Sequence, residues 1–300
     1  MTASAHANRR LVFAACPLCG EAEAVVIAGG SSGVTEWVRC RCSLIYKRSE
    51  PADWSVTPRS LGDASDTPDA AHYDEAYFDR YDRRRRHRIA KSRRQIRDAL
   101  EVAPAGDLLD VGCSLGYAME AARSLGLAAS GVDLAPHALA RCRQLGFEAR
   151  EGTLENLPFD DASFAVVILK HVFEHTSAPR AALAELRRVT VDGAALFFAV
   201  PNALYFKATN APGTSRFFRG EAGRAHQVYW SPATLSQLLE EAGFRVASLH
   251  PRLWHTRGPL LLRVAEALAL PLRLPLRAAA GVLGLRKEFW LVATREPPRR

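Results

Sequence analysis

The sequence predicts an α/β fold, in which a mostly parallel sheet carries helices on both faces. From residue 105 onward, short apolar segments typical of buried strands alternate with segments of helical periodicity. This alternation favours a parallel sheet, because parallel strands need crossover connections and these are usually helices. Strands are expected at residues 107–111, 128–133, 164–169, 194–200, 244–249 and 288–294, with a further strand just before Gly152.

The expected helices have recognisable ends. Gly126 and Gly146 each follow a helical segment, where a left-handed backbone conformation is favourable. Pro136 and Pro179 stand at the first positions of two others, where the missing N–H costs nothing. Ser231 precedes the last helix and can cap its first turn. These signals support the alternation of strand and helix.

Length and charge set the broad class of the protein. The chain has 300 residues, of which 48% are hydrophobic, and a formal net charge of +8. This length fits one large domain or two of unequal size with a substantial core. The positive charge favours acidic partners, phosphorylated substrates or anionic surfaces. No apolar run is long enough to span a bilayer, so we expect a cytoplasmic protein, with a peripheral position at the inner membrane face as an open alternative.

Three regions are expected along the chain. They are a small N-terminal module at 1–50, a linker and basic helical segment at 51–104, and the α/β domain at 105–300. The α/β domain contains an apolar insertion at 258–286, which prolines and arginines interrupt. We expect this insertion to form a helical cover over the core. The alternative is an amphipathic segment that lies against a membrane or over a lipid-like acceptor.

The basic segment contains four consecutive arginines, from Arg83 to Arg86. Ile89, Ile96 and Leu100 recur at helical spacing, so one face can pack while the arginines stay in water. A nucleic-acid or membrane patch is the alternative interpretation. No aromatic residues alternate with the arginines, as they would in a single-strand binder. We therefore expect a solvated face and no nucleic-acid partner.

Four cysteines near the N-terminus form two pairs, Cys16 with Cys19 and Cys40 with Cys42. In a chain of this length, such pairs indicate a metal site rather than a disulfide framework. Four thiolates can surround zinc tetrahedrally, and a closed site of this kind organises structure without performing chemistry. The second pair is one residue closer than the first, so a module that has lost its metal is the alternative.

The segment Asp107-Leu-Leu-Asp-Val-Gly-Cys-Ser-Leu-Gly116 joins an expected strand to an expected helix. Its glycines let the backbone turn sharply and approach a ligand closely. In a doubly wound sheet, a nucleotide-like cofactor binds at this first turn. The next strand ends at Asp133, whose carboxylate can accept hydrogen bonds from both hydroxyls of a ribose. Alone, these features fit NAD and S-adenosylmethionine (SAM) equally.

Three details favour SAM. The loop reads Asp-x-Gly-x-x-x-Gly and lacks the Gly-x-Gly-x-x-Gly of dinucleotide binders, because no pyrophosphate has to be held. The loop then needs fewer glycines, and an acid such as Asp110 can instead help to hold the ammonium of a cofactor that carries an amino acid. Later in the chain, the segment 152–160 follows the third strand, and the strand that begins at Phe164 runs into a polar, histidine-bearing turn.

At these motifs the chain resembles the class I SAM-dependent methyltransferase family, specifically the branch with ubiquinone-type O-methyltransferases. The matching stretches are Leu-Leu-Asp-Val-Gly-Cys-Ser-Leu-Gly, Gly-Val-Asp-Leu-Ala-Pro, Leu-Pro-Phe-Asp-Asp-Ala-Ser-Phe, Glu-His, Val-Pro-Asn and Glu-Ala-Gly-Phe. The resemblance implies a Rossmann-like, seven-stranded domain. The cysteine pairs are similar to zinc ribbons fused to such methyltransferases, which implies a zinc-ribbon-like module with a structural Zn²⁺.

The resemblance also implies which residues hold SAM. The methionine end would lie at the turn after the first strand, and the ribose and adenine at the tip of the second strand and beyond the third. The expected set is Tyr77, Asp110, Gly112, Cys113, Gly116, Asp133, Leu134, Thr153, Leu154 and Lys170. Ser114 stands where relatives often carry glycine, and Ala165 where many carry aspartate. Neither departure removes a principal contact to the cofactor.

Three histidines are candidates for the general base that a hydroxyl acceptor requires. His171 and His175 follow the fourth strand, and His226 follows the fifth. Loops at the carboxyl ends of the strands face the site in this fold. His226 stands in a polar and aromatic loop, so we expect it to contribute to methyl transfer rather than to SAM affinity. A structural role for each histidine, or a divalent cation held by Glu174 and a histidine, is the alternative.

The expected reaction is methyl transfer from SAM to an oxygen of a small molecule, and less readily to carbon or nitrogen. A sugar, polyketide, quinone or lipid-linked intermediate fits this expectation best. One alternative is a nucleic-acid methyltransferase, although Leu169-Lys-His-Val stands where base-methylating enzymes carry an Asn/Asp-Pro-Pro-Tyr-type loop. The other is a non-catalytic SAM-binding assembly partner.

Overall fold

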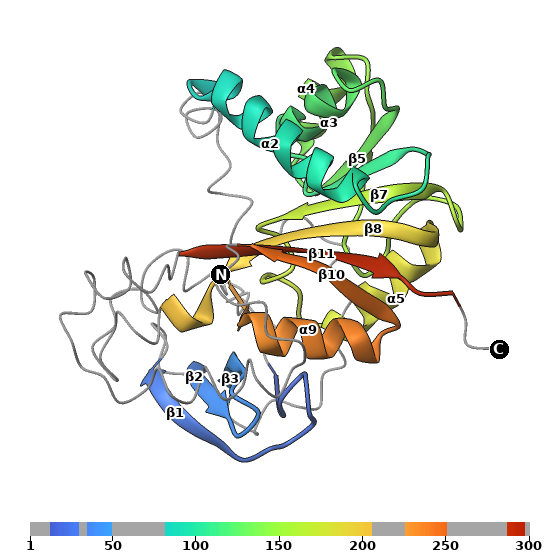
Figure 1. Cartoon of the computed structure of the whole chain (residues 1–300). Coiled ribbons are helices and arrows are strands. Elements are labelled where there is room, and N and C mark those ends of the chain that lie inside the picture. Colours follow the sequence, from blue (N-terminus) through green and yellow to red (C-terminus); the bar gives the residue numbers. More distant parts are fainter. Residues whose placement is uncertain (1–12, 30–34, 50–81, 206–225, 251–286, 298–300) are drawn as a thin grey trace, which may run out of the picture.

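Seven strands form the central sheet of the protein (Figure 1). The computed structural model describes residues 13–29, 35–49, 82–205, 226–250 and 287–297. The sheet strands are β4 (Leu108–Val111), β5 (Ala129–Asp133), β6 (Glu148–Glu151), β7 (Phe164–Lys170), β8 (Thr190–Pro201), β10 (Phe244–His250) and β11 (Glu288–Arg295). Their order is β10-β11-β8-β7-β4-β5-β6. All neighbours are parallel except β11, which is antiparallel to both β8 and β10. The predicted mostly parallel, seven-stranded sheet is confirmed.

Helices cover both faces of this sheet (Figure 1). Because side chains alternate along a strand, Val166 and Ile168 of β7 face one side, and Val167 and Leu169 face the other. The first side packs against α2 (Arg85–Leu100) and α3 (Tyr117–Arg123), with α4 (Pro136–Gln144) beside them. The second side packs against α5 (Pro179–Val189) and α9 (Pro232–Glu241). Both faces are therefore buried, as a parallel sheet requires.

The predicted helix ends are present. Pro136 and Pro179 open their helices, and the Ser231 side chain accepts a hydrogen bond from the Thr234 backbone N–H in a capping box. Gly126 and Gly146 adopt the left-handed conformation, with φ of +79° and +77°. Local chemistry of this kind can be recognised in sequence, because it depends on neighbouring residues alone.

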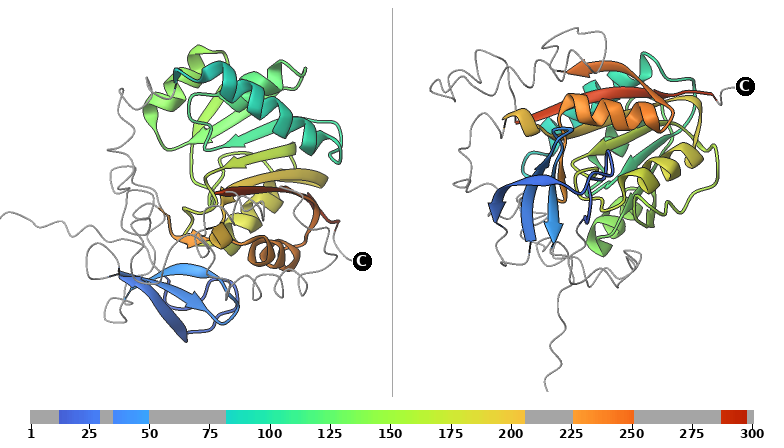
Figure 2. Two further views of the ribbon diagram at one scale, coloured as in Figure 1. Left: turned by 60° about the vertical axis from the view of Figure 1, so that its left-hand side comes forward. Right: turned by 90° about the horizontal axis from the view of Figure 1, so that it is seen from below.

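The N-terminal module is an antiparallel sheet of β1 (Ala24–Gly29), β2 (Thr35–Cys40) and β3 (Ile45–Ser49). A fourth strand, β9 (Val228–Tyr229), comes from the far part of the chain and pairs with β3. Figure 2 shows this small sheet next to the large domain, on the side of α9. Its buried residues join the main core, where Leu18, Val38 and Leu44 share one cluster with Trp230 and Leu235. The expected division at residue 50 did not include this added strand.

Several expectations concern parts of the chain outside the described residues. They are the linker at 51–72, the SAM contact at Tyr77 and the apolar insertion at 258–286. Among the helices that the structure does describe, none has both the length and the apolar character needed to cross a bilayer.

Candidate active site

A cavity of about 640 Å³ lies at the carboxyl ends of the parallel strands. Its walls come from the residues that follow β4, β5, β6 and β7 and from one side of α2. Its volume falls within the range of small-molecule sites. This is the edge of the sheet where the sequence placed both the cofactor and the candidate histidines.

The turn between β4 and α3 has a backbone that favours small residues. Gly112 has φ of +67°, and a Cβ there would lie 2.5 Å from Val172 Cγ2. Ser114 has φ of +48°, a left-handed conformation that glycine adopts most readily. Gly116 has φ of +80° and packs against the Cys142 sulfur instead of lining the cavity. Its part in the site is therefore to bend the chain into α3.

Asp133, at the tip of β5, joins two loops. Its carboxylate accepts hydrogen bonds from the backbone N–H of Ser114 at 2.8 Å and of Ala135 at 2.9 Å. Burial raises the pKa of Asp133, and these N–H groups oppose that rise by favouring the ionised form. The side chain lines the cavity beside Leu134, and Thr153 and Leu154 line it from beyond β6. The structure brings these predicted contacts together, with Cys113 in the same wall.

Asp110 and Lys170 are two further ionisable residues in the cavity wall. Asp110 is 2% exposed, and burial raises its pKa to about 7, while the nearby Lys170 ammonium acts in the opposite direction. Burial also lowers the pKa of Lys170, whose ammonium donates to Ser92 Oγ at 2.8 Å. A cationic ligand would favour the ionised form of Asp110, because the lysine alone does not offset the cost of burial.

Of the three candidate histidines, His171 is tied to two carboxylates. Its Nδ1 lies 3.2 Å from Glu174 Oε1, and its Nε2 lies 2.9 Å from Glu288 Oε2. Burial opposes protonation of His171, but the bonds to these carboxylates raise its pKa to about 9. An imidazole that already carries a proton at neutral pH is a poor base, so its position indicates a structural role.

His175 and His226 lie side by side, with ring centroids 4.8 Å apart in an edge-to-face arrangement. His175 lines the cavity. His226 is not among the described residues that line it, and its side chain is only 12% exposed. The His226 Nδ1 lies 3.0 Å from the Tyr229 hydroxyl, and burial lowers the pKa of this histidine to about 3. The structure therefore places His175 at the cavity and His226 beside it.

The sequence did not indicate that α2 forms one wall of the cavity. Arg88, Lys91, Ser92 and Gln95 all line it. Gln95 is 3% exposed, and neither its amide nitrogen nor its oxygen has a hydrogen-bond partner in the described part of the protein. Both Ser92 and Gln95 lie close to Ile96 on the packed side of the helix. The presence of these polar residues on an otherwise apolar face was the one feature of the sequence that could have indicated this wall of the cavity.

We expect the free energy of unfolding to decrease as the pH rises from about 6.5 to 9. The pKa of His171 is raised from 6.5 to about 9, so its contribution is complete below pH 6.5 and is lost as the pH passes through 9. Glu288, whose pKa is lowered to about 2, stays ionised throughout this window. Urea unfolding at several pH values measures the slope. The slope should be smaller in His171→Gln, and an equal slope in both proteins would contradict this origin.

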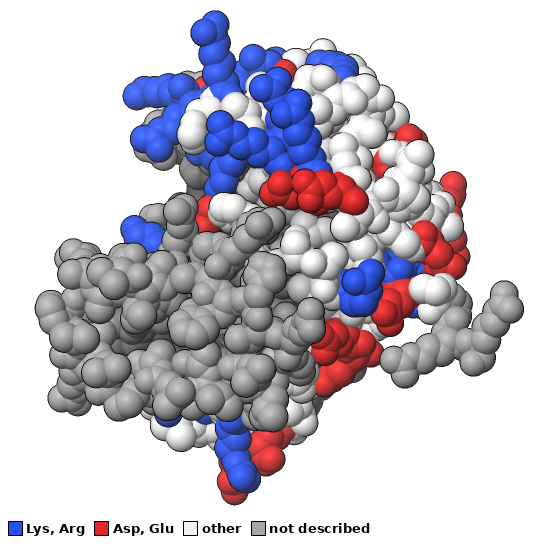
Figure 3. Space-filling model, in the orientation of Figure 1, with Lys and Arg blue, Asp and Glu red and all other residues white. Residues whose placement is uncertain are grey.

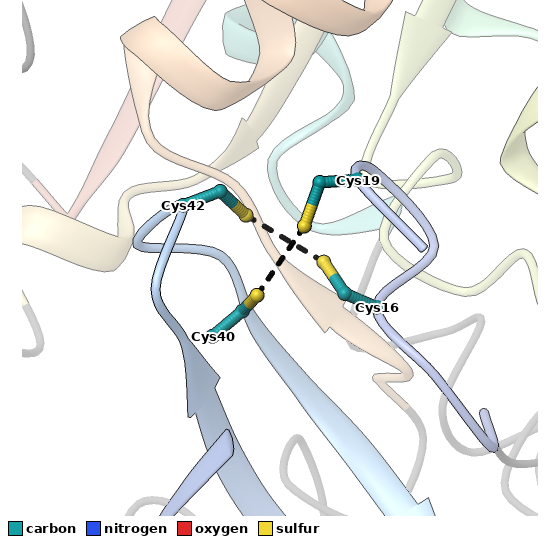
Figure 4. Close-up of side chains that lie close together, drawn as sticks. All are labelled: Cys16, Cys19, Cys40 and Cys42. Atoms are coloured by element: carbon teal, nitrogen blue, oxygen red, sulfur yellow. Dashed lines mark hydrogen bonds between the residues drawn. The ribbon is translucent and has the colours of Figure 1, made fainter. Parts of the chain in front are cut away.

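The four N-terminal cysteines converge on one point (Figure 4). Sulfur atoms of Cys16 and Cys42 lie 3.5 Å apart, those of Cys19 and Cys40 lie 3.4 Å apart, and all four lie within 4.8 Å of one another. Zn–S bonds of about 2.3 Å place tetrahedral sulfur atoms about 3.8 Å apart. The residues therefore fit a zinc ion despite the shortened second pair. Ser43 has φ of +76°, the same value as Gly20 after the first pair, so serine adopts the turn expected of glycine.

Comparison with known proteins agrees with this fold. Residues 109–198 match the methyltransferase domain family. A malonyl-[acyl-carrier protein] O-methyltransferase of Serratia marcescens is 38% identical over 97 residues, 32% of this chain and 38% of that protein. A probable SAM-dependent methyltransferase of Mycolicibacterium smegmatis is 30% identical over 164 residues, 54% of this chain and 59% of that protein. The chain thus spans between 38% and 59% of the length of these relatives.

A SAM-dependent methyltransferase from Archaeoglobus fulgidus shares the fold, with a TM-score of 0.51 and 18% identity over 73% of this chain and 100% of that one. The sheet order and this likeness show a Rossmann-like methyltransferase fold. Over residues 109–198 the chain is thus similar to the methyltransferase domain family, and its relatives include a probable SAM-dependent methyltransferase.

Proposed function

We propose that the protein transfers a methyl group from SAM to an oxygen of a small-molecule acceptor. The observation that carries this proposal is the composition of one cavity. Two acidic strand tips, Asp110 and Asp133, flank the Gly112 turn there, and His175 lies in the same cavity. This arrangement places a cofactor site and a base at the same edge of the sheet.

The cofactor half of the cavity suits each part of SAM. Asp133 can accept hydrogen bonds from the ribose hydroxyls while it holds the two loops, and Gly112 allows close approach of the ligand to the backbone. Asp110 suits the ammonium of the methionine part. The basic side chains of Arg88 and Lys91, which line the same cavity, suit its carboxylate.

The acceptor half has to align and activate a nucleophile. The methyl group on a sulfonium is already activated, so the protein chiefly orients the acceptor, excludes water and removes the hydroxyl proton. His175 is the histidine best placed for proton removal, because it faces the cavity and His171 already holds a proton. An acceptor of modest size follows from the volume, since the cavity of about 640 Å³ has to hold SAM as well.

The surface of α2 supports a small-molecule acceptor over a nucleic acid only indirectly. In Figure 3 basic side chains gather over this helix, whose exposed residues include Arg86, Arg93 and Arg97. The apolar side of the helix packs on α3, as expected for a solvated basic face.

We further propose that the cysteine cluster holds a structural zinc ion, which the sulfur distances support.

We expect His175→Ala to slow methyl transfer about 10²–10⁴-fold, which is the usual contribution of a general base. SAM affinity should change less than about twofold, because the proposed contacts to SAM come from other residues, chiefly on β4, β5 and α2. Calorimetry with SAM and its demethylated product measures binding. Release of that product in the presence of catechols, hydroxylated polyketides and sugars measures transfer.

His87→Ala is the matched control, because His87 is exposed on α2 and is not among the cavity-lining residues of the described chain. It should behave as the wild type does. Loss of SAM binding in His175→Ala would show a structural role. Turnover that a chelator abolishes and Mg²⁺ restores would instead favour a cation held by Glu174, His175 and His226, whose ligand atoms lie within 4.8 Å of one another.

A further inference from the structure

We propose that the N-terminal module positions the proposed base: Tyr229, held by the module, fixes His226, and His226 fixes His175 at the cavity. This inference rests on the proposed function of His175. It assigns Tyr229 and His226 as positioning residues. It also gives the N-terminal module a role in the geometry of the active site, in addition to its structural role.

The first step runs from the module to β9. Strand β3 pairs with β9 in antiparallel register, with Ile45 opposite Tyr229 and Tyr46 opposite Val228. The Lys47 backbone N–H donates to the Gln227 carbonyl at 3.0 Å. The Trp37 and Tyr229 rings, both buried, pack with centroids 4.9 Å apart. The N-terminal module therefore contributes to the position of β9, through strand pairing and through the packing of Trp37 on Tyr229.

The second step runs from β9 to the turn that carries His175. The backbone N–H groups of Gln227 and Val228 donate to the carbonyl of Glu174, at 2.8 Å and 3.2 Å. Glu174 immediately precedes His175, so the peptide between them is hydrogen-bonded to a strand of the module sheet. A displacement of β9 would therefore move the backbone of the proposed base directly.

The third step is made by side chains. The Tyr229 hydroxyl lies 3.0 Å from His226 Nδ1, and the His226 ring packs edge-to-face against the His175 ring. On its other side, His226 Nε2 lies 3.9 Å from Glu174 Oε1. His226 therefore stands between a tyrosine fixed by the module and the histidine at the cavity.

The surroundings select one form of His226. The titratable and charged groups around its buried ring are Glu174, His171, His175 and Lys47. A neutral imidazole carries one proton, and the nearby carboxylate of Glu174 favours that proton on Nε2. Nδ1 is then the acceptor, and the Tyr229 hydroxyl donates to it. Loss of that hydroxyl removes the group that holds the ring orientation, and it leaves only the Glu174 carboxylate, 3.9 Å away, to favour this tautomer.

The cofactor contacts do not depend on this chain of interactions. Asp110, Gly112 and Asp133 belong to β4, β5 and the turn that follows β4, in the seven-stranded sheet, whereas β9 belongs to the sheet of the module. A fault in the positioning residues should consequently affect methyl transfer and leave SAM affinity almost unchanged.

The test is a comparison of wild type and Tyr229→Phe, which keeps the ring against Trp37 and removes only the hydroxyl. In the wild type bound to the demethylated cofactor product, ¹⁵N NMR of labelled histidines should show His226 protonated on Nε2. In Tyr229→Phe this signature should give way to a mixture of tautomers. Turnover of whichever panel acceptor the wild type methylates should fall about 10- to 100-fold, as expected for a misplaced catalytic group.

The wild-type spectrum alone can overturn the proposal, even if the variant fails to fold. A proton on Nδ1 of His226 would show that Tyr229 is not the donor. Unchanged tautomer and unchanged turnover in Tyr229→Phe would also overturn it. By contrast, a wild type that binds no SAM or transfers no methyl group would contradict the proposed function, while the His226 tautomer would still report on the positioning contacts.

Discussion

Asp133→Ala should weaken SAM binding about 100-fold. The carboxylate of Asp133 holds the backbone N–H groups of Ser114 and Ala135 and is proposed to bind the ribose. Hydrogen bonds to a charged group contribute about 1.5–3 kcal/mol each, and a loss of about 2.8 kcal/mol corresponds to a factor of 100 in affinity. The alanine variant loses the ribose contact and also releases the turn that carries the cofactor. Calorimetry with SAM measures the change.

Two further variants separate these contributions. Asp133→Asn keeps the shape and one acceptor oxygen but removes the charge, so we expect a loss of about tenfold. Glu151→Ala is the matched acidic control, since Glu151 pairs with Asp133 across β5 and β6 and its side chain is exposed. The affinity of the Glu151→Ala variant for SAM should equal that of the wild type. Retention of affinity within about threefold in Asp133→Ala would exclude Asp133 as the ribose ligand.

Most of the sheet was predictable from sequence because its signals are local. Buried strands such as β7 are continuous apolar runs, and helix ends depend on the residues beside them. The main difference concerns β8, which was expected at 194–200 and extends over Thr190–Pro201. Its first four residues include Asp192 and Gly193, the latter at φ of +77°, and the β7–β8 register shifts between Phe164 and Val166. An irregular strand start of this kind has no periodicity to detect.

The two halves of the site also differ in how far the sequence predicted them. The cofactor half was predictable because Asp110, Gly112 and Asp133 stand next to recognisable strand ends. The opposite wall was not, because Gln95 comes from a helix that precedes the sheet and whose surface is dominated by arginine. The pairing of β3 with β9 joins residues that are more than 180 positions apart, such as Ile45 and Tyr229. Two-residue strands give no pattern, so only the folded chain shows that the module contacts the histidine pair.

Removal of the proposed zinc ion should lower the thermal midpoint by about 10 °C or more. Cys16 and Cys40 are both 3% exposed, and loss of the metal would leave buried thiols with only weak contacts to one another. Structural zinc can contribute about 10 kcal/mol or more to a small module. Packing of this module on the main core should preserve part of its structure without the metal. A net loss of about 4 kcal/mol, at about 2–4 °C per kcal/mol for a domain of this size, gives the expected shift.

Metal analysis and thermal unfolding of the full chain, before and after a zinc-selective chelator, measure this effect. Zinc should restore the midpoint and Mg²⁺ should not, because thiolates select the softer ion. Less than about half an equivalent of zinc in carefully purified protein, with no shift on chelation, would show that the four thiols stand without a metal. Chelation should affect the affinity for SAM far less than it affects the thermal midpoint, because β4 and β5 lie in the other sheet. If SAM affinity were lost together with the thermal midpoint, the module would support the whole domain and not only the acceptor half of the cavity.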